Sequence, residues 1–458
     1  MAASTASQFL KMWSMLLLFF ACFSSLLSTS SCERTIKLVN LLYRHGDRSP
    51  ARGYPNDNYT EDTWPQGFGQ LTKSGMAQQY ELGQWLRKRY VTDLKLFDGI
   101  YRPKQFYVHS SPKERTIMSA QSNLQGFFPA ESGGGKPSSG TPPWPPVPVF
   151  TVAEEQDYLL SGSKIQNCDT VRDFFQYAEN SPAEQQYIKD NQTFFDRVQE
   201  KAGLTGDVVF EDFYHLGDSL IREHKEGRNL PEWADDETFN RLKATQDYAF
   251  EAEFSNMTTD EKRITSGVLI AAMVANMKAH LNRTNNDSRI FMYSGHDSNI
   301  APFLGTFGLF TNVEPPTASC MMVELYKEDD GSHTVQLLFR NDTSKPPYLL
   351  KFLECNERCP VQNFFHIASP FVVDDIDELC RRKPPSLPLD VEWNIGWILF
   401  ASSLALAGLL PLIVCVLLSC GVGGRRRLQN SRQRLEPINF HLLGGPNSES
   451  EDESVFDT

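Results

Sequence analysis

The stretch of sequence that decides the fold is IKLVNLLYRHGDRSP, residues 36–50. Its first half is mostly apolar, which predicts a buried strand. His45 follows that strand closely, with Arg44 directly before it and Arg48 three residues after it. Imidazole is a nucleophile, and guanidinium groups match the oxygens of a phosphate. We therefore expect phosphoryl transfer at the end of this strand.

A second stretch repeats this arrangement far along the chain. Residues 289–297 read RIFMYSGHD, an apolar strand that ends at His296 and Asp297. Alternating and β-branched residues predict two further strands, over 321–326 and 334–339. Two strands of one sheet would thus each end at a histidine.

The segment between the two histidine motifs predicts a crossover. Apolar residues at helical spacing indicate a helix over 73–90, and residues 105–108 read as a second strand. Ser111 is the expected N-cap of the next helix, with Pro112 at its first position and Arg115 in its first turn. A strand, helix and strand in this order form a parallel pair, whose ligands gather beyond the carboxyl ends of the strands. Arg115 should therefore meet the histidines there.

Length and composition predict a globular α/β protein. The chain has 458 residues, of which 40% are hydrophobic, and this is enough for one large core. We expect a mixed, largely parallel sheet flanked by helices. A mostly helical pattern over 169–280 predicts a smaller helical subdomain, in which the aromatic residues pack the core. Residues 133–148 are rich in Gly, Ser and Pro and read as a surface loop.

Two apolar segments predict the topology. Residues 1–31 carry a single lysine, an apolar run and small residues, which is typical of a secretory signal peptide. Residues 395–420 are apolar, uncharged and long enough to cross a membrane as one helix, and three arginines follow closely. This predicts a single-pass type I membrane protein with residues 32–390 lumenal or extracellular and 421–458 cytoplasmic. A retained N-terminal anchor and a buried core helix are the respective alternatives.

Six glycosylation sequons lie between the two apolar segments, which agrees with a lumenal or extracellular domain. The net charge of −13 argues against nucleic acid as a partner. The asparagines of the sequons are Asn58, Asn191, Asn256, Asn282, Asn286 and Asn341.

The nine cysteines divide by compartment. Cys22 lies in the predicted signal peptide, and Cys415 and Cys420 lie in the predicted membrane segment. The other six would face an oxidising lumen, where disulfides are expected. Cys355 and Cys359 are close enough in sequence to close a local loop. A zinc site is the alternative, but no second closely spaced pair of ligands accompanies them.

Phosphoryl transfer needs a nucleophile, positive charge around the phosphate oxygens and a proton for the leaving group. We expect His45 to attack phosphorus through a neutral ring nitrogen and Asp297 to donate the proton. Because a carboxyl group is protonated mainly in acid, this assignment predicts an acidic optimum, and a water molecule completes the hydrolysis. The groups expected to hold the phosphate are Arg44, Arg48, Arg115 and His296.

Burying Arg44 and Arg48 side by side without an anion would be costly. We expect Asp47 to be a structural partner of these arginines. In an alternative interpretation, carboxylates and imidazoles of the two motifs hold one or two metal ions. The arginines on both sides of the first histidine would repel a divalent cation, which disfavours that alternative. Its ligands would be His45, Asp47, His296 and Asp297.

The motif over residues 44–50, together with Ser-Gly-His-Asp over 294–297, resembles the histidine acid phosphatases. Residues 64–72 and 315–320 support the resemblance, which extends over 37–380. Within that family the chain is most similar to the membrane-anchored lysosomal, testicular and prostatic members. The resemblance implies a large α/β domain with a smaller helical one and broad action on phosphate monoesters.

For the site, the resemblance implies a phosphohistidine intermediate at His45, Asp297 as proton donor, and neither metal nor other cofactor. It also implies a homodimer, with small phosphomonoesters, phosphoproteins or lysophospholipids as candidate substrates. The implied disulfides are Cys168 with Cys380 and Cys355 with Cys359. Lysosomal or endosomal membrane and cell surface are both open as locations. An inositol-polyphosphate phosphatase of the same family and a catalytically weak phosphate-binding protein of the cell surface are the alternative functions.

The chain departs from the family pattern in three places. Residues 109–111 read His-Ser-Ser where the family has Arg-Ser-Thr. The cysteine expected to pair with Cys320 is missing near Arg222, so Cys320 is either free or paired with Cys32. The predicted cytoplasmic tail contains no tyrosine, which departs from the sorting signal of the lysosomal relative.

Overall fold

The computed structural model describes one compact unit, Met1–Arg382, in part. The predicted signal peptide, membrane segment and cytoplasmic tail lie outside the described residues, as do most of the predicted loop over 133–148 and the start of the predicted helical subdomain. The structure describes residues 34–129, 145–160, 181–285, 287–375 and 379–380.

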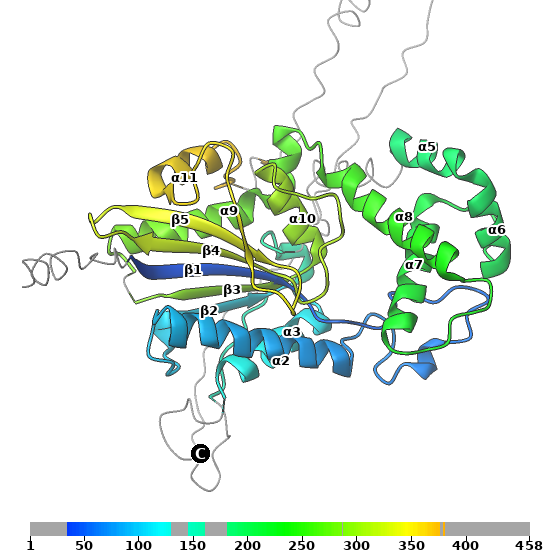
Figure 1. Ribbon diagram of the computed structural model, residues 1–458, viewed down its shortest axis with the longest axis horizontal. Helices are drawn as coiled ribbons and strands as arrows, with labels where there is room; N and C mark the ends of the chain where they lie inside the picture. Colours follow the sequence, from blue (N-terminus) through cyan, green and yellow to red (C-terminus); the bar gives the residue numbers. More distant parts are fainter. Residues whose placement is uncertain (1–33, 130–144, 161–180, 286, 376–378, 381–458) are drawn as a thin grey trace, which may run out of the picture. The chain divides into compact units, whose positions relative to one another are not determined.

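A mixed sheet forms the centre, as the sequence predicts, with the strand order β2-β3-β1-β4-β5-β6 and with β7 paired to β5 (Figure 1). Among the described strands, parallel pairing joins β2, β3 and β1, and the remaining pairs are antiparallel, so the expectation of a largely parallel sheet is wrong. The strands are β1 (Thr35–Arg44), β2 (Phe106–Ser110), β3 (Ile290–Gly295), β4 (Cys320–Lys327), β5 (His333–Arg340), β6 (Tyr348–Leu350) and β7 (Cys359–Pro360).

The first two predicted strands are parallel but are not neighbours, because β3 lies between them. This order has a direct consequence for function. The three parallel strands end at the same edge of the sheet. The residues that follow β1, β2 and β3 are therefore brought together there.

Strand β1 is buried on both faces, which explains its long apolar run. Leu38 and Leu42 contact the core on one face, and Val39 and Leu41 contact the core on the other. An irregularity in the pairing with β4 between Ile36 and Leu38 places Ile36 on the same face as Val39.

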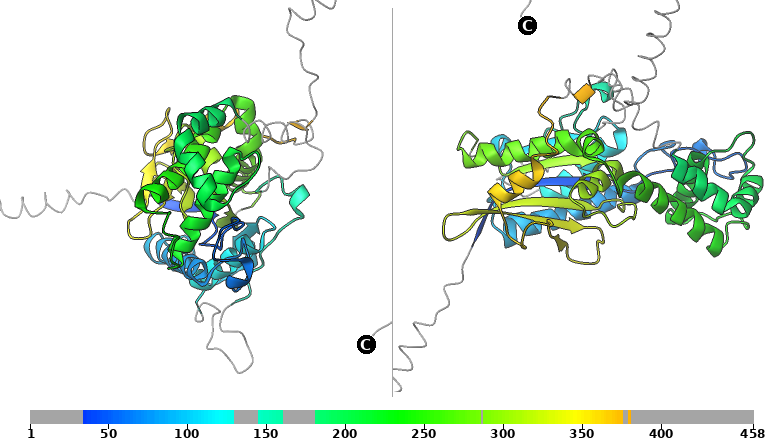
Figure 2. Two further views of the ribbon diagram at one scale, coloured as in Figure 1. Left: turned by 90° about the vertical axis from the view of Figure 1, so that its right-hand side faces the viewer. Right: turned by 90° about the horizontal axis from the view of Figure 1, so that it is seen from above.

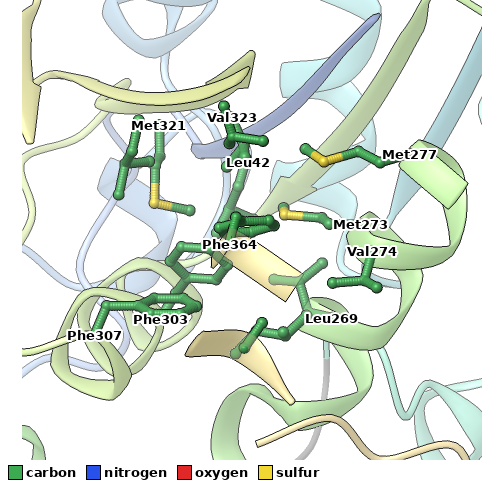
Figure 3. Close-up of a cluster of buried hydrophobic side chains, with 14 of the residues drawn as sticks. Leu42, Leu269, Met273, Val274, Met277, Phe303, Phe307, Met321, Val323 and Phe364 are labelled. Atoms are coloured by element: carbon green, nitrogen blue, oxygen red, sulfur yellow. The ribbon is translucent and has the colours of Figure 1, made fainter. Parts of the chain in front are cut away.

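Helices cover both faces of the sheet (Figures 1 and 2). Helices α2 (Lys73–Arg87) and α3 (Glu114–Phe127) pack on one face, and α9 (Thr259–Leu281), α10 (Asp297–Thr306) and α11 (Val361–Ala368) pack on the other. Figure 3 shows part of the second core, where strand and helix side chains meet. Its labelled residues are Leu42, Leu269, Met273, Val274, Met277, Phe303, Phe307, Met321, Val323 and Phe364.

Helix α2 packs closely on α3 because a glycine lies in the contact. A Cβ atom at Gly83 would lie 1.9 Å from the carbonyl oxygen of Asn123, so no other residue fits there without a shift. The predicted helix over 73–90 is α2, which continues as a π-helical segment, η2 (Lys88–Asp93).

The predicted start of α3 is wrong. The helix begins at Glu114 with Lys113 as its N-cap, although Arg115 does lie in the first turn. Ser111 does not cap the helix because its hydroxyl group lies in a different hydrogen-bond network, which contains His296 and Thr116.

Four helices form a separate hydrophobic cluster beside the sheet (Figure 1). Phe194, Phe195 and Val198 are buried in this cluster, as expected for core residues. Helix α9 instead packs against the sheet. It is the one helix among the described residues that is long and apolar enough to cross a membrane, and its packing shows a core helix. The four helices are α5 (Pro182–Asp190), α6 (Gln192–Ala202), α7 (Phe210–Lys225) and α8 (Asp236–Phe254).

The cysteines follow the predicted pattern where they are described. Cys355 and Cys359 form a disulfide bond. Cys380 is disulfide-bonded, and its expected partner Cys168 lies outside the described residues. Cys320 is free and fully buried, which decides between the two alternatives for this residue.

Four of the sequon asparagines are exposed, whereas Asn191 is half-buried. The amide nitrogen of Asn191 donates to the carbonyl oxygen of Tyr187, 2.9 Å away, and its amide oxygen accepts from Arg241 at 3.1 Å. A glycan on this nitrogen would displace the first contact. The exposed asparagines are Asn58, Asn256, Asn282 and Asn341, and Asn286 lies outside the described residues.

The buried carboxyl group of Glu223 on α7 should make the folded state more stable in acid than at neutral or higher pH. It is fully buried, and neither carboxyl oxygen has a hydrogen-bond partner among the described residues. Burial, with Asp57 nearby, raises the pKa of Glu223 to about 8. The folded state therefore favours the protonated form, and its stability should fall as the pH rises from about 4.5 to about 8.

We expect Glu223→Gln to stabilise the protein by about 1 to 3 kcal/mol at pH 8 and to have little effect at pH 4.5. Urea unfolding at the two pH values measures the difference. Glu226→Gln, a change at an exposed position one residue beyond α7, is the control. An equal effect of Glu223→Gln at both pH values would contradict the prediction.

Candidate active site

His45 lies at the carboxyl end of β1 and is 2% exposed. Its Nδ1 lies 2.7 Å from the carbonyl oxygen of Gly46. A carbonyl oxygen only accepts hydrogen bonds, so Nδ1 carries the proton. In the neutral ring the lone pair is then on Nε2, and this is the nitrogen that can attack.

Two glycines bring the loop after β1 against the start of α2. A Cβ atom at Gly46 would lie 2.2 Å from the carbonyl oxygen of Gly75, and one at Gly75 would lie 2.1 Å from the carbonyl oxygen of Asp47. Neither distance is possible for a real side chain. The Arg-His-Gly-Asp motif therefore has its glycine for close backbone approach, which fixes the position of His45.

The surroundings of His45 favour its neutral form. Burial lowers the pKa of His45 well below its usual value, and the positive charges of Arg115 and Arg44 lower it further. A histidine in water would be protonated at pH 5 and would lose its nucleophilic lone pair. The lowered pKa lets His45 keep its lone pair at a lower pH than a histidine in water does.

Arg44 is 2% exposed and lies between two carboxylates. Its Nη2 is 2.5 Å from Oδ2 of Asp297 and 2.6 Å from Oε1 of Glu314. Its Nη1 donates to the carbonyl oxygen of Pro315. The buried Nε group has no hydrogen-bond partner among the described residues.

Arg48 is held by a residue that the sequence analysis missed. Asp218 on α7 accepts from both terminal nitrogens of Arg48, at 2.7 and 3.1 Å. Asp218 also accepts from Nε of Arg222 at 3.0 Å. Burial opposes ionisation of Asp218, but the two arginines outweigh it and lower the pKa of its carboxyl group far below the usual range. The Asp218 carboxylate thus fixes the orientation of the Arg48 guanidinium group.

Arg115, on the first turn of α3, adds a third guanidinium group close to His45. Burial and the neighbouring Arg48 lower the pKa of Arg115 to about 10, so it remains charged in acid and at neutral pH. Its buried Nε has no hydrogen-bond partner in the part of the chain that the structure describes. Two buried N–H groups without acceptors, those of Arg44 and Arg115, are what an oxyanion site requires.

His296 is oriented by a chain of hydroxyl groups. Its Nε2 lies 2.8 Å from Oγ of Ser111, which lies 2.8 Å from Oγ1 of Thr116. Because Thr116 donates to backbone carbonyls, Ser111 donates to Thr116 and accepts from Nε2. Burial and Arg115 lower the pKa of His296 to about 3. Neutral His296 therefore has its lone pair on Nδ1.

Asp297 is the first residue of α10 and lies beside Arg44. Burial acts to raise the pKa of Asp297, but Arg44 and His296 lower it, and the net shift is downward. Asp297 is therefore ionised in the resting site except in strong acid.

Asp47 pairs with Lys225 and Arg222, and not with the predicted partners Arg44 and Arg48. Its Oδ1 accepts from Thr317 at 2.8 Å and from Lys225 at 3.0 Å, and Arg222 lies 3.5 Å away. The expectation that Asp47 compensates Arg44 and Arg48 is wrong, because that role belongs to other carboxylates, those of Asp218, Asp297 and Glu314.

The structure brings the six predicted site residues to one place, the edge where β1, β2 and β3 end. His45 and His296 lie with their ring centres 5.5 Å apart. The charges of the four other predicted residues act on one or both of these rings. Among the described residues, no group of three or more His, Cys, Asp or Glu side chains is arranged to hold a metal ion. The four others are Arg44, Arg48, Arg115 and Asp297.

Comparisons with known proteins give a consistent result. The pattern of the histidine phosphatase superfamily (branch 2) matches residues 35–340. Lysosomal acid phosphatase from Bos taurus is 38% identical over 76% of this chain and 81% of its own length. The same protein from Homo sapiens is 36% identical over 84% and 87%. Prostatic acid phosphatase from Rattus norvegicus is 33% identical over 75% and 88%.

Solved structures with the same fold include Hafnia alvei phytase in complex with tartrate. The TM-score is 0.57 at 16% identity, over 76% of this chain and 99% of the phytase. A Bifidobacterium longum multiple inositol polyphosphate phosphatase matches with a TM-score of 0.51 at 14% identity, over 76% of this chain and 96% of its own. At this identity the likeness concerns the fold alone.

Proposed function

Because the chain belongs to the histidine phosphatase superfamily (branch 2) and is an acid phosphatase, a phosphoric monoester hydrolase, we propose that it acts through a phosphohistidine at His45. Nε2 attacks phosphorus as the bond from phosphorus to the ester oxygen breaks, and Asp297 gives its proton to that oxygen. Water then attacks phosphorus as the bond from phosphorus to Nε2 breaks, the Asp297 carboxylate takes a proton from the water, and neutral His45 is restored. The products are an alcohol and orthophosphate.

One observation carries this proposal: the lone pair on Nε2 of His45 lies beside buried guanidinium groups whose Nε–H groups have no acceptor among the described residues. A phosphate would supply acceptors for Arg44 and Arg115. Arg48 completes the set of guanidinium groups proposed to hold it. His296 can join them as a donor only when its ring is protonated, because the Nε2–H of the neutral ring donates to Ser111. The pairing of Asp218 with Arg48 fixes one of these donors before substrate binds.

The proton donor is activated by the substrate itself. A bound phosphate competes with Asp297 for the positive charge of Arg44, and its own negative charge acts on the carboxylate. Both effects raise the pKa of Asp297 above its resting value, so that this residue takes up a proton as substrate binds. Since the lowered pKa of His45 favours its neutral form, the two requirements are met together only at acidic pH.

This mechanism predicts activity that does not depend on divalent metal. We expect the purified full-length protein in detergent to hydrolyse p-nitrophenyl phosphate in acid, with unchanged kcat after dialysis against EDTA. Above the optimum, kcat should fall by up to tenfold per pH unit as Asp297 ionises in the enzyme–substrate complex. Loss of activity in EDTA, with recovery on addition of a divalent metal, would contradict the mechanism.

The location and the partners are proposed from the relatives and from the sequence. Names of the relatives suggest a lysosomal or extracellular location, and the two apolar segments support a type I membrane protein whose catalytic domain is lumenal or extracellular. Small phosphomonoesters are the proposed substrates, and a homodimer is the proposed assembly. We favour an acid phosphatase over an inositol-polyphosphate phosphatase because the acid phosphatases are the relatives with 33–38% identity.

A further inference from the structure

Glu314 is a carboxylate in the site to which the mechanism assigns no role. It lies on the loop between α10 and β4, and its side chain is 13% exposed. Its Oε1 is 2.6 Å from Nη2 of Arg44, the same nitrogen that lies 2.5 Å from Asp297. One guanidinium group therefore serves two carboxylates, one of which is the proposed proton donor.

The backbone holds Glu314 in place independently of any substrate. Its N–H group donates to Oδ1 of Asp247 on α8, 3.0 Å away, and the next residue, Pro315, accepts from Nη1 of Arg44 through its carbonyl oxygen. Arg222, the nearest other cation, is 3.8 Å from Oε1 of Glu314 and is already paired with Asp218. The negative charge of Glu314 is therefore compensated mostly by Arg44.

Several other charged or titratable groups face this cluster. No cation among them lies closer to Glu314 than Arg44 does. They come from the loop after β1, from α3, from the end of β3, from α7 and from α8. These groups are His45, Arg48, Arg115, His296, Tyr214, Asp218, Arg222 and Asp247.

We propose that Glu314 is a positioning residue that divides the charge of Arg44, weakening the hold of this arginine on both the phosphate and the proton donor Asp297. The inference rests on the proposed function. With Glu314 in place, Asp297 takes up its proton more readily and orthophosphate leaves more readily. Without it, Arg44 would bind Asp297 and phosphate more tightly.

The test is Glu314→Gln, which keeps the shape of the side chain and removes its charge. Calorimetry on the full-length protein should show orthophosphate binding about threefold to tenfold more tightly than in the wild type. The basic limb of the kcat profile, which reports Asp297 in the enzyme–substrate complex, should move to lower pH by about half a unit. Glu200→Gln, at an exposed position on α6, should leave both quantities unchanged.

The outcomes separate this inference from the proposed function. Unchanged or weaker phosphate binding in Glu314→Gln, with an unshifted pH profile, would overturn the role of Glu314 while leaving the phosphohistidine mechanism in place. A purely structural role would lower kcat and Tm at every pH without tightening phosphate binding. If the glutamine variant does not fold, Glu314→Asp, whose carboxylate is one methylene further from Arg44, should shift both quantities in the same direction by less. If the wild type itself does not bind orthophosphate, the proposed function fails.

Discussion

Replacement of His45 by alanine should lower kcat by a factor on the order of 10⁴ or more, because in the proposed mechanism His45 forms the covalent intermediate. The three arginines and His296 remain, so the variant should still bind orthophosphate with an affinity close to that of the wild type. Added imidazole fits the space vacated by the ring and should restore part of the activity. Steady-state kinetics with and without imidazole, together with calorimetry, measures these effects.

His366→Ala is the matched control. His366 lies on α11, which packs on the face of the sheet covered by α9 and α10. It should leave kcat unchanged. A His45→Ala enzyme that folds, binds phosphate and keeps more than about a hundredth of the wild-type kcat would show that the nucleophile is another group.

Asp297→Asn should give the second largest loss, about 10² to 10⁴ in kcat, with a strong dependence on the leaving group. An asparagine cannot donate a proton in the manner of a carboxylic acid. A p-nitrophenolate ion leaves without help, whereas an alkoxide needs the proton. The variant should therefore retain more activity on p-nitrophenyl phosphate than on an alkyl phosphate, and the basic limb of its pH profile should disappear.

Comparing the two substrates in parallel separates loss of the acid from general damage to the site. Asp207→Asn, at an exposed position between α6 and α7, serves as the control and should behave as the wild type on both. An equal loss on the two substrates would assign proton donation to a different residue.

The sequence predicted which histidines meet at the edge of the sheet, because they lie in two contiguous motifs at strand ends. His45 and His296 each follow an apolar strand directly, and the parallel arrangement of those strands brings them together. The insertion of β3 between the first two strands could not be predicted, because strand order is set by packing between segments far apart in the chain.

The groups that aim the arginines were missed for a similar reason. Asp218 belongs to a helix outside both motifs, and its only local signal is the spacing of four residues to Arg222. Glu314 lies in an irregular loop, where no periodicity marks it. Ser111 was misread as a helix cap because the preference of serine for caps is local, whereas its hydroxyl group has a distant partner in His296.

The central position of β1 also governs how the molecule must assemble. Val39 pairs with Ile290, and Glu324 lies opposite it on the other side, so both partners are made about 250 or more residues later. Contacts of such long sequence separation form slowly. During synthesis, β1 leaves the ribosome with both backbone edges unpaired and both apolar faces uncovered, and it stays so until β3 and β4 follow. The edge of the sheet that carries the candidate active site is therefore among the last parts of the protein to form, and chains that stop before β3 expose a strand prone to aggregation.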